Sequence, residues 1–393
     1  MTGEQESLKK QVVASIDAQR QALIDLSLRI HANPEEGFQE EQASGWLCAY
    51  LEEQGFAVER NYCDLATAFL ASTGNERPRI ALLAEYDALP GLGHACGHNL
   101  IAAMSVGAAT AAKSIVDATG GSIAVIGTPA EEVYGGKAIM AERGAFKGLD
   151  AAMMVHPGSR NSVLTGALAC TTLYVEYFGR EAHAASRPEQ GINALDALLL
   201  AFNAVAALRQ HIRDSARVHG IITHGGDAPN VVPGHTTAVF LVRAADEAYL
   251  EEMKQRTLAC FQAGAEATGA RLEYRWDEVQ YAPLHTNVPL AEAFRRNLTA
   301  LGRVVEDPPS SRAMGSTDVG NVSMLVPTIH PSIAVAPRET SIHTPEFARL
   351  AAAKEGHAAL IDAAKALAMT AVDLLVDDDL RKKTAAAFAA ERF

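Results

Sequence analysis

Hydrophobic positions near the start of the chain recur with the spacing of helices that bury one face. Within residues 5–32 the apolar side chains fall near a 3.6-residue period, which predicts an amphipathic helix. The positions that define its buried face are Val12, Ile16, Leu23, Leu26 and Ile30. Residues 40–54 are predicted as a second helix, which ends at Gly55. The pattern therefore predicts two helices ahead of the first strongly apolar strand.

Three later apolar runs each predict a buried strand whose last residues are polar. They cover residues 79–90, 122–132 and 149–157, and a helix of small residues at 100–115 separates the first two. Another helix is expected at 135–144. Strands that are joined through helices run parallel, and a parallel sheet carries its sites beyond the carboxyl ends of its strands. We therefore expect the polar ends of these runs to lie along one edge of one sheet.

From about residue 170 the pattern changes to alternating strands and two long helices. The order is strand, helix (190–213), two strands, helix (246–268) and strand, which predicts a ferredoxin-like four-stranded sheet covered on one face by two helices. We interpret residues 170–280 as an inserted α+β domain. The fold class is then α/β, with a mainly parallel sheet flanked by helices built from residues 1–169 and 281–393.

Composition and charge narrow the class of protein further. The chain has 393 residues, too many for one compact core, and its 34 basic against 47 acidic residues give a net charge of −13. An acidic surface argues against nucleic acid or an anionic membrane as a partner. The polar start predicts no signal peptide, and no apolar run approaches the roughly 20 residues of a membrane span. Five widely spaced cysteines predict no disulfide framework, so we expect a cytoplasmic location.

The predicted strand ends carry side chains that divalent metals accept as ligands. Thiolate, imidazole and carboxylate ligands suit zinc, manganese or cobalt. These groups are Cys96 and His98, the pair Glu131–Glu132, and His156, with His343 far downstream. Taken singly, each has an ordinary structural explanation, because a lone histidine is more often a hydrogen-bonded core or surface residue than a ligand. Their combination at one predicted sheet edge would need several such explanations in the same place.

The adjacent acids Glu131 and Glu132 indicate what a metal here would be used for. Neighbouring residues cannot both face one metal without an unusual turn, so one would ligate and the other act as a base. A metal lowers the pKa of bound water to about 7, and a nearby carboxylate can pass the proton to a leaving amine. The pair therefore predicts metal-assisted hydrolysis.

Seven stretches of the chain resemble, in order and spacing, the motifs of one enzyme family. They are IHANPEEGFQEEQAS, AEYDALPGLGHACGHN, TPAEEVYGGKAIM, MMVHPG, GREAHAASRPEQGINALDA, NVVP and SIHTPEF. The family is the aminoacylase/carboxypeptidase-G metallopeptidases, in their amidohydrolase branch. That branch holds indole-acetyl-amino-acid hydrolases, aminobenzoyl-glutamate hydrolase, and dipeptidase-like proteins acting on Xaa-Arg and β-alanyl-lysine peptides. The resemblance runs from about residue 25 to 376.

The resemblance implies two divalent metal ions per subunit in the first domain. The residues in ligand positions are Cys96, His98, Glu132, His156 and His343. It makes Glu131 the general base, and it places Asp87 near the metals, where it orients a ligand.

The resemblance also assigns roles within the inserted domain, which becomes a lid and dimerisation domain. His183 takes the position of a catalytic donor that reaches across a homodimer to the oxyanion of the reaction. Asn230 and Arg243 are candidates for binding the substrate carboxylate, although an ordinary surface charge is an equal alternative for Arg243.

The expected activity is hydrolysis of the amide bond in a small dipeptide, or in an N-acyl amino acid, with a free carboxylate. Asn99 stands where most of the branch has Asp, a departure shared with the dipeptidase-like members. The alternative is an N-acyl-amino-acid amidohydrolase, and a rival of another class is a non-catalytic binding protein on the same fold. We assign structural roles to His31, as a helix cap, and to His285, His330 and His357. For His94 the alternatives are a structural role or a contact with one of the metal ligands.

Overall fold

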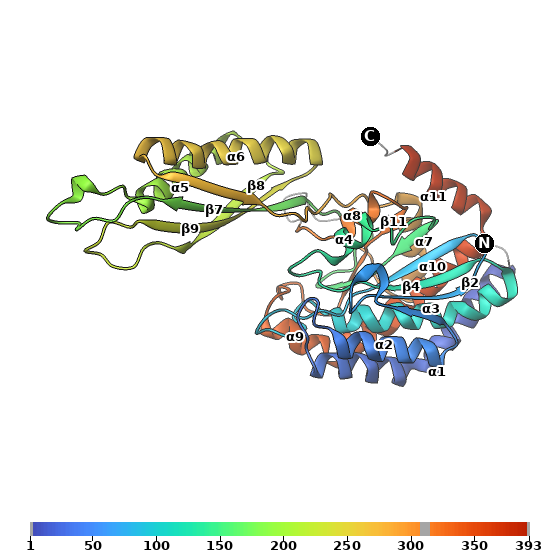
Figure 1. Cartoon of the computed structure of the whole chain (residues 1–393). Coiled ribbons are helices and arrows are strands. Elements are labelled where there is room, and N and C mark those ends of the chain that lie inside the picture. The colour runs from blue at the N-terminus through green and yellow to red at the C-terminus, as the bar shows by residue number, and fades with distance from the viewer. Residues whose placement is uncertain (1–2, 307–314, 391–393) are drawn as a thin grey trace. The chain divides into compact units, whose positions relative to one another are not determined.

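The computed structural model describes residues 3–306 and 315–390, which form two compact units (Figure 1). The larger unit takes the chain up to Gly166, resumes at Leu284 and resumes again at Asn321. The smaller unit runs from Ala167 to Pro283 and gains a segment that ends at Gly320. The sequence assigned that segment to the first domain, with all of residues 281–393.

Two hydrogen bonds explain why the segment ending at Gly320 belongs to the smaller unit. The backbone N–H of Leu168 donates to the carbonyl of Gly315 at 2.8 Å, and Arg243 Nη1 donates to Ser316 Oγ at 2.9 Å. These hydrogen bonds join residues more than seventy positions apart, so the local hydrophobic pattern does not predict them.

The larger unit is built on a six-stranded mixed sheet in which four neighbouring strands, β4, β3, β5 and β11, run parallel. Strands β1 and β2 add to it as an antiparallel pair. In order across the sheet the strands are β1 (Ala57–Arg60), β2 (Phe69–Gly74), β4 (Ser122–Gly127), β3 (Arg79–Ala84), β5 (Ala151–Met153) and β11 (Thr328–Ile329). The predicted α/β class with a mainly parallel sheet is confirmed.

The predicted strand over 149–157 is divided in the structure. Its first half is β5, and its second half is β6 (His156–Gly158), which leaves the main sheet and pairs in parallel with β12 (Ser332–Ala334). His156 therefore begins a short strand of a separate two-stranded sheet, rather than ending a strand of the main one.

Long helices bury the sheet and one another through the apolar faces that their periodicity predicted. Helix α1 packs on α3 and α10, and α3 packs on β3 and β4. Val12, Ile16, Leu23 and Ile30 of α1 are fully buried. The helices of this unit are α1 (Gly3–Ala32), α2 (Glu41–Glu53), α3 (His98–Thr119), α4 (Gly136–Glu142), α7 (Val288–Ala300), α9 (Pro345–Ala351), α10 (Lys354–Val376) and α11 (Asp378–Ala390), and α8 (Val319–Ser323) spans the boundary at Gly320.

Helix α3 is longer than the predicted 100–115. Among the described residues it alone has the length and composition of a membrane span, with a mean hydropathy of 1.3. However, 89% of that window is buried inside the fold, which is typical of the core helix of a globular domain.

A buried polar network ties three of these helices together. Lys9 Nζ of α1 donates to Asp373 Oδ2 of α10 at 2.7 Å and to Asn297 Oδ1 of α7 at 2.8 Å. Gln5 Nε2 donates to the other oxygen of Asp373 at 2.6 Å. Because all four side chains are buried, the network fixes where the first helix packs.

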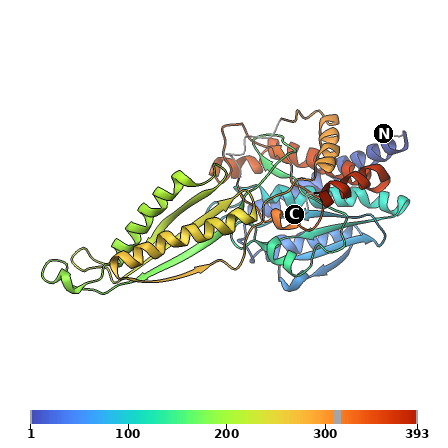
Figure 2. The same ribbon diagram turned by 90° about the horizontal axis from the view of Figure 1, so that it is seen from above.

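The smaller unit has the predicted order of strands and helices. Its antiparallel sheet is ordered β10-β7-β9-β8, and Figure 2 shows α5 and α6 side by side along it. The elements are β7 (Ala169–Phe178), α5 (Ala194–Leu208), β8 (Arg217–His224), β9 (His235–Ala244), α6 (Glu247–Thr268) and β10 (Arg271–Trp276).

Helix α5 is shorter than the predicted 190–213. The side chain of Asn193 caps its start by accepting from the backbone N–H groups of Leu195 and Asp196. Short 3-10 turns, Pro188–Gln190 and Arg209–His211, take up the residues on either side.

Candidate metal centre

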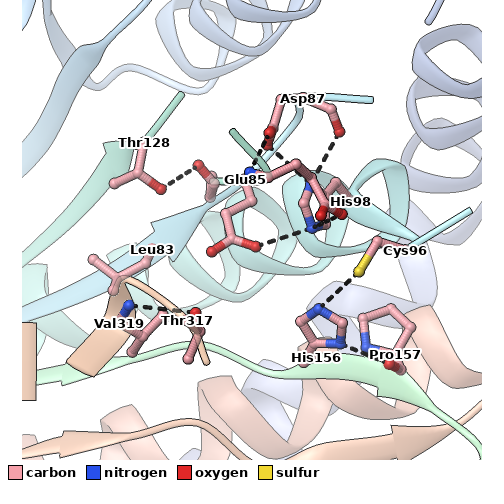
Figure 3. A network of polar contacts seen from close by, with 12 residues as sticks. Leu83, Glu85, Asp87, Cys96, His98, Thr128, His156, Pro157, Thr317 and Val319 are labelled. Carbon is pink, nitrogen blue, oxygen red and sulfur yellow. Dashed lines mark hydrogen bonds and ion pairs between the residues drawn. The ribbon is translucent and has the colours of Figure 1, made fainter. Parts of the chain in front are cut away.

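The loop after β3 holds one histidine in a defined orientation. His98 is the first residue of α3 and is fully buried. Its Nδ1 lies 2.9 Å from Asp87 Oδ1 and 2.9 Å from the carbonyl of Asp87 (Figure 3). Both partners are acceptors, so Nδ1 carries a proton and Nε2 is the nitrogen that remains to face a metal. Asp87 thus fixes the orientation of the His98 ring, as a carboxylate beside a metal-binding histidine commonly does.

Asp87 also connects this loop to the one that follows β4. Its Oδ2 accepts from the backbone N–H of Glu132 at 3.0 Å. One buried carboxylate therefore fixes both the ring of His98 and the turn that presents the two acids.

Cys96 and His156 meet on the other side of His98. Cys96 Sγ lies 3.4 Å from His156 Nε2 (Figure 3). His156 Nδ1 donates to the carbonyl of Pro157 at 2.7 Å, which leaves Nε2 with the lone pair. Gly97, with φ of 83°, lets the loop pass close to Pro157, because a Cβ there would lie 2.9 Å from the proline ring.

His343 completes the cluster from a segment near the end of the chain. Its backbone N–H donates to the carbonyl of Ala95 at 2.9 Å, and it adopts φ of 62° just before α9. Its Nε2 lies 3.5 Å from Glu132 Oε1, which in turn is 3.7 Å from His98 Nε2.

All six sequence-predicted metal-site side chains therefore meet within the larger unit. Ligand atoms within 4.8 Å of one another form three overlapping groups, namely Cys96 with His98 and His156, Cys96 with Glu132 and His343, and His98 with Glu131 and Glu132. The shared members make these groups one continuous cluster.

The electrostatics of the cluster fit a cation. Burial raises the pKa of the Cys96 thiol and lowers the pKa of His156. Burial opposes ionisation of Glu132, yet the contact with His343 prevails and lowers its pKa to about 2. Glu132 Oε1 and His98 Nε2 are buried without a hydrogen-bond partner among the described residues. A divalent ion between them would satisfy both atoms and favour the thiolate.

Two buried charged residues beside the cluster were not predicted from the sequence. Lys137 Nζ of α4 lies 2.5 Å from Glu85 Oε1, and both side chains are fully buried. Glu85 Oε2 lies 3.4 Å from His98 Nε2 (Figure 3). Glu85 follows β3 within AEYDALP, so its position at the end of a strand could be predicted. Its pairing with the lysine of GGKAIM could not.

Histidines that the sequence analysis set aside as structural also gather here. The ring of His330 lies 5.4 Å from that of His156, and its burial lowers its pKa well below the usual value. His94 is buried next to His31, with 6.0 Å between ring centroids. His31 Nε2 donates to the carbonyl of Ala348 in α9.

The three predicted residues of the inserted domain lie in the smaller unit. The loops of His183 and Asn230 are adjacent, because the N–H of Ala184 donates to the carbonyl of Asn230 at 3.0 Å. His183 is exposed, and its Nδ1 accepts from the backbone N–H of Ser186. Arg243 on β9 is half-buried, and its Nη1 donates to Ser316 Oγ.

A mixed α/β fold with a histidine, cysteine and carboxylate cluster beyond its parallel strands defines a metallohydrolase class of site. The sequence model described as Peptidase family M20/M25/M40 matches residues 81–366. The chain belongs to this peptidase family, and it is a hydrolytic enzyme. The predicted family resemblance is confirmed.

Relatives cover nearly the whole chain. The mouse (Mus musculus) Xaa-Arg dipeptidase is 36% identical over 389 residues, covering 95% of this chain and 90% of that protein. One of the subunits of the p-aminobenzoyl-glutamate hydrolase of Escherichia coli (strain K12) is 30% identical, covering 93% and 92%.

Solved structures share the fold at low sequence identity. A putative aminohydrolase from methicillin-resistant Staphylococcus aureus has a TM-score of 0.77 at 19% identity, with 93% of this chain and all of that chain covered. The Bacillus subtilis YXEP protein, a dinuclear metal-binding peptidase of the M20 family, has a TM-score of 0.70 at 20% identity, covering 91% and 99%.

Proposed function

We propose that this enzyme hydrolyses the amide bond of a small dipeptide, or of an N-acyl amino acid, with a free carboxylate, using two divalent ions. The observation that carries the proposal is the cluster itself, in which the five ligand side chains, Glu132 among them, lie together with Glu131. The dipeptidase relatives favour a dipeptide. The ions would be zinc, manganese or cobalt, all of which accept this mixture of sulfur, nitrogen and oxygen ligands.

Cys96 belongs to two of the ligand groups. It shares one group with His98 and His156, and the other with Glu132 and His343. Asp87 keeps His98 in the tautomer that can ligate. Bound divalent ions supply Lewis acidity toward the carbonyl of the scissile bond.

The proton transfers fall to Glu131. It belongs to the ligand cluster through His98 and Glu132, yet it is not needed to complete the set of five. In this proposal its carboxylate takes a proton from the attacking water and delivers it to the nitrogen of the leaving amine.

The smaller unit would recognise the substrate. Asn230 and Arg243 are the proposed partners of the substrate carboxylate, and an arginine can hold a carboxylate through two parallel hydrogen bonds. Arg243 Nε is buried without a hydrogen-bond partner among the described residues, which leaves one donor of its guanidinium for such a ligand. His183 is the proposed donor to the oxyanion of the transition state, contributed across a homodimer.

N-acyl amino acids are the second candidate substrates. The 30% identity to the aminobenzoyl-glutamate hydrolase chain supports them, since that name describes an acyl group without a free amine. Five free cysteines fit the reducing cytoplasm that we propose as the location.

A substrate panel separates the two candidates. Dipeptides ending in Arg, Lys or Glu, and the matching N-acetyl and N-benzoyl amino acids, would be assayed with added manganese, zinc or cobalt. We expect hydrolysis of the dipeptides, with faster turnover than their acylated counterparts. The matched control is Glu131→Gln with the same metal content. A metal-loaded wild-type protein that hydrolyses no amide of the panel would refute the proposed function.

A further inference from the structure

Glu40 is a buried acid that the proposed mechanism does not use. It immediately precedes α2 in the larger unit, and its side chain is fully buried. Oε1 accepts from the backbone N–H of Ala130 at 2.8 Å, and Oε2 accepts from Thr67 Oγ1 at 2.9 Å. Glu40 therefore lies about ninety residues before the acids of the site in sequence, yet it is hydrogen-bonded to the residue that directly precedes them.

The residue that Glu40 holds has an unusual backbone. Ala130 has φ of 60°, a left-handed conformation that side chains other than glycine adopt rarely. Its carbonyl accepts from the N–H groups of Tyr134 and Gly136, so the turn closes on itself. Gly37 packs against it so closely that a Cβ there would lie 2.9 Å from the Ala130 methyl group.

Glu131 is held through both of its neighbours. On one side Glu40 accepts from the N–H of Ala130, and on the other Asp87 accepts from the N–H of Glu132. The two bonds pin the backbone directly before and directly after Glu131. A backbone that is fixed on both sides holds two adjacent side chains in defined and different directions.

We propose that Glu40 is a positioning residue, which fixes the left-handed turn at Ala130 and thereby aims Glu132 at the metals and Glu131 at the substrate. The inference rests on the proposed function, because it concerns the two acids that the function employs. It adds a residue from near the start of the chain to the working site.

The geometry requires Glu40 to supply a hydrogen-bond acceptor, Oε1, to the backbone N–H of Ala130. Its burial raises its pKa to about 7, so the second oxygen is not required to be charged. Glutamine has the same shape, keeps the acceptor for Ala130 and offers an N–H to the Thr67 hydroxyl, which can also accept. Leucine fills the same space without an acceptor and leaves the Ala130 N–H buried and unpaired.

The test compares Glu40→Leu, Glu40→Gln and Thr67→Val in the full chain. Thr67→Val removes the other hydrogen bond of Glu40 and leaves the bond to Ala130. Each variant is titrated with Co²⁺, whose absorption reports bonding to the Cys96 thiolate and whose affinity is read by competition with a chelator. Thermal unfolding is measured alongside, to separate loss of stability from loss of the site.

We expect Glu40→Leu to weaken Co²⁺ binding by about 10–100-fold, the span seen when a group that orients metal ligands is removed. Glu40→Gln should bind Co²⁺ like the wild type, and Thr67→Val should lose stability without losing affinity. Should Glu40→Leu not yield folded protein, Glu40→Asp takes its place, because its shorter side chain cannot reach both partners.

Unchanged Co²⁺ affinity in folded Glu40→Leu, or in Glu40→Asp where that variant takes its place, overturns the inference. Loss of affinity in Glu40→Gln equal to that in Glu40→Leu also overturns it, because glutamine retains the acceptor. The Co²⁺ readout needs no substrate. A failure of the proposed function would instead appear as a metal-loaded wild type without amidase activity, so the two failures are distinct.

Discussion

Glu131 and Glu132 are adjacent in the chain and both belong to the ligand cluster, but the proposed function gives them different tasks. Glu132 has His343 at 3.5 Å and His98 at 3.7 Å, and its pKa is lowered to about 2. A carboxylate that stays ionised between two imidazoles is suited to ligation. We therefore propose proton transfer for Glu131, the role that the family resemblance implies.

Glu131→Gln should therefore retain metal while losing the chemical step. Glutamine keeps the shape of the side chain and removes its basicity, so we expect kcat to fall by roughly 10²–10⁴ with KM little changed. The measurement is steady-state kinetics together with metal analysis of the same sample. Glu132→Gln is the matched control and should lose metal. If metal is lost from Glu131→Gln and kept by Glu132→Gln, the two roles are exchanged.

Residue types were a good guide to which side chains form the cluster and a poor guide to what supports it. Cys96, His98 and Glu132 were predictable because they follow buried strands, and parallel strands bring their carboxyl ends together. Glu40 and Lys137 were not, because each meets the site through a contact between segments that are distant in sequence. Local patterns carry no information about which buried acid a given lysine or amide will face.

At the scale of elements, the polar network of Lys9 decides how α1 is held. An apolar stripe fixes which face of α1 is buried, but apolar contacts alone tolerate sliding along the helix axis. The charged pair of Lys9 with Asp373, shared with Asn297, sets one position along α10 and α7.

Lys9→Met should destabilise the fold, because it leaves the Asp373 carboxylate buried without its cation. Breaking a buried pair from one side costs about 3–5 kcal/mol of unfolding free energy. Urea denaturation followed by circular dichroism measures it, and Lys10→Met, at the exposed neighbouring position, is the control. The double variant Lys9→Met/Asp373→Leu should recover part of the loss. Equal effects at positions 9 and 10 would mean that the pair contributes nothing.

Elements with a strong period were predicted well, and their ends were not. The order of the smaller unit followed from alternation in its strands and the stripes of its helices. Helix α5 began later than expected because Asn193, a residue with no place in the apolar pattern, caps it. The division of residues 149–157 into β5 and β6 likewise depends on pairing with β12, which lies far along the chain.

At the scale of the whole molecule, the smaller unit has features that favour the proposed homodimer. Strand β8 lies at an edge of its sheet, and Ile221 on it is 65% exposed. Leu199 and Leu200 of α5 are also exposed. Exposed strand edges and apolar side chains become covered when two copies pair about a two-fold axis. Light scattering would then give twice the 41.7 kDa chain mass.

The last prediction concerns His183, which we propose to act in the site of the neighbouring subunit. His183→Ala should keep its fold, its dimer and its metal, while losing about 10²–10³ in kcat, as removal of one oxyanion donor does. The side chain is exposed and its loop is held by backbone bonds to the Asn230 loop, so its loss should not disturb the structure. Unfolding temperature and metal content are the controls for that statement.

Mixing two inactive variants tests whether His183 acts across the dimer. Glu131→Gln and His183→Ala chains are combined under conditions that exchange subunits, and exchange is verified by native mass spectrometry on differently tagged chains. In a heterodimer that shares His183 across subunits, one site lacks both groups and the other has both. Activity should then return, up to half of the wild-type value per heterodimer. If the chains exchange and no activity returns, His183 does not act in the partner's site.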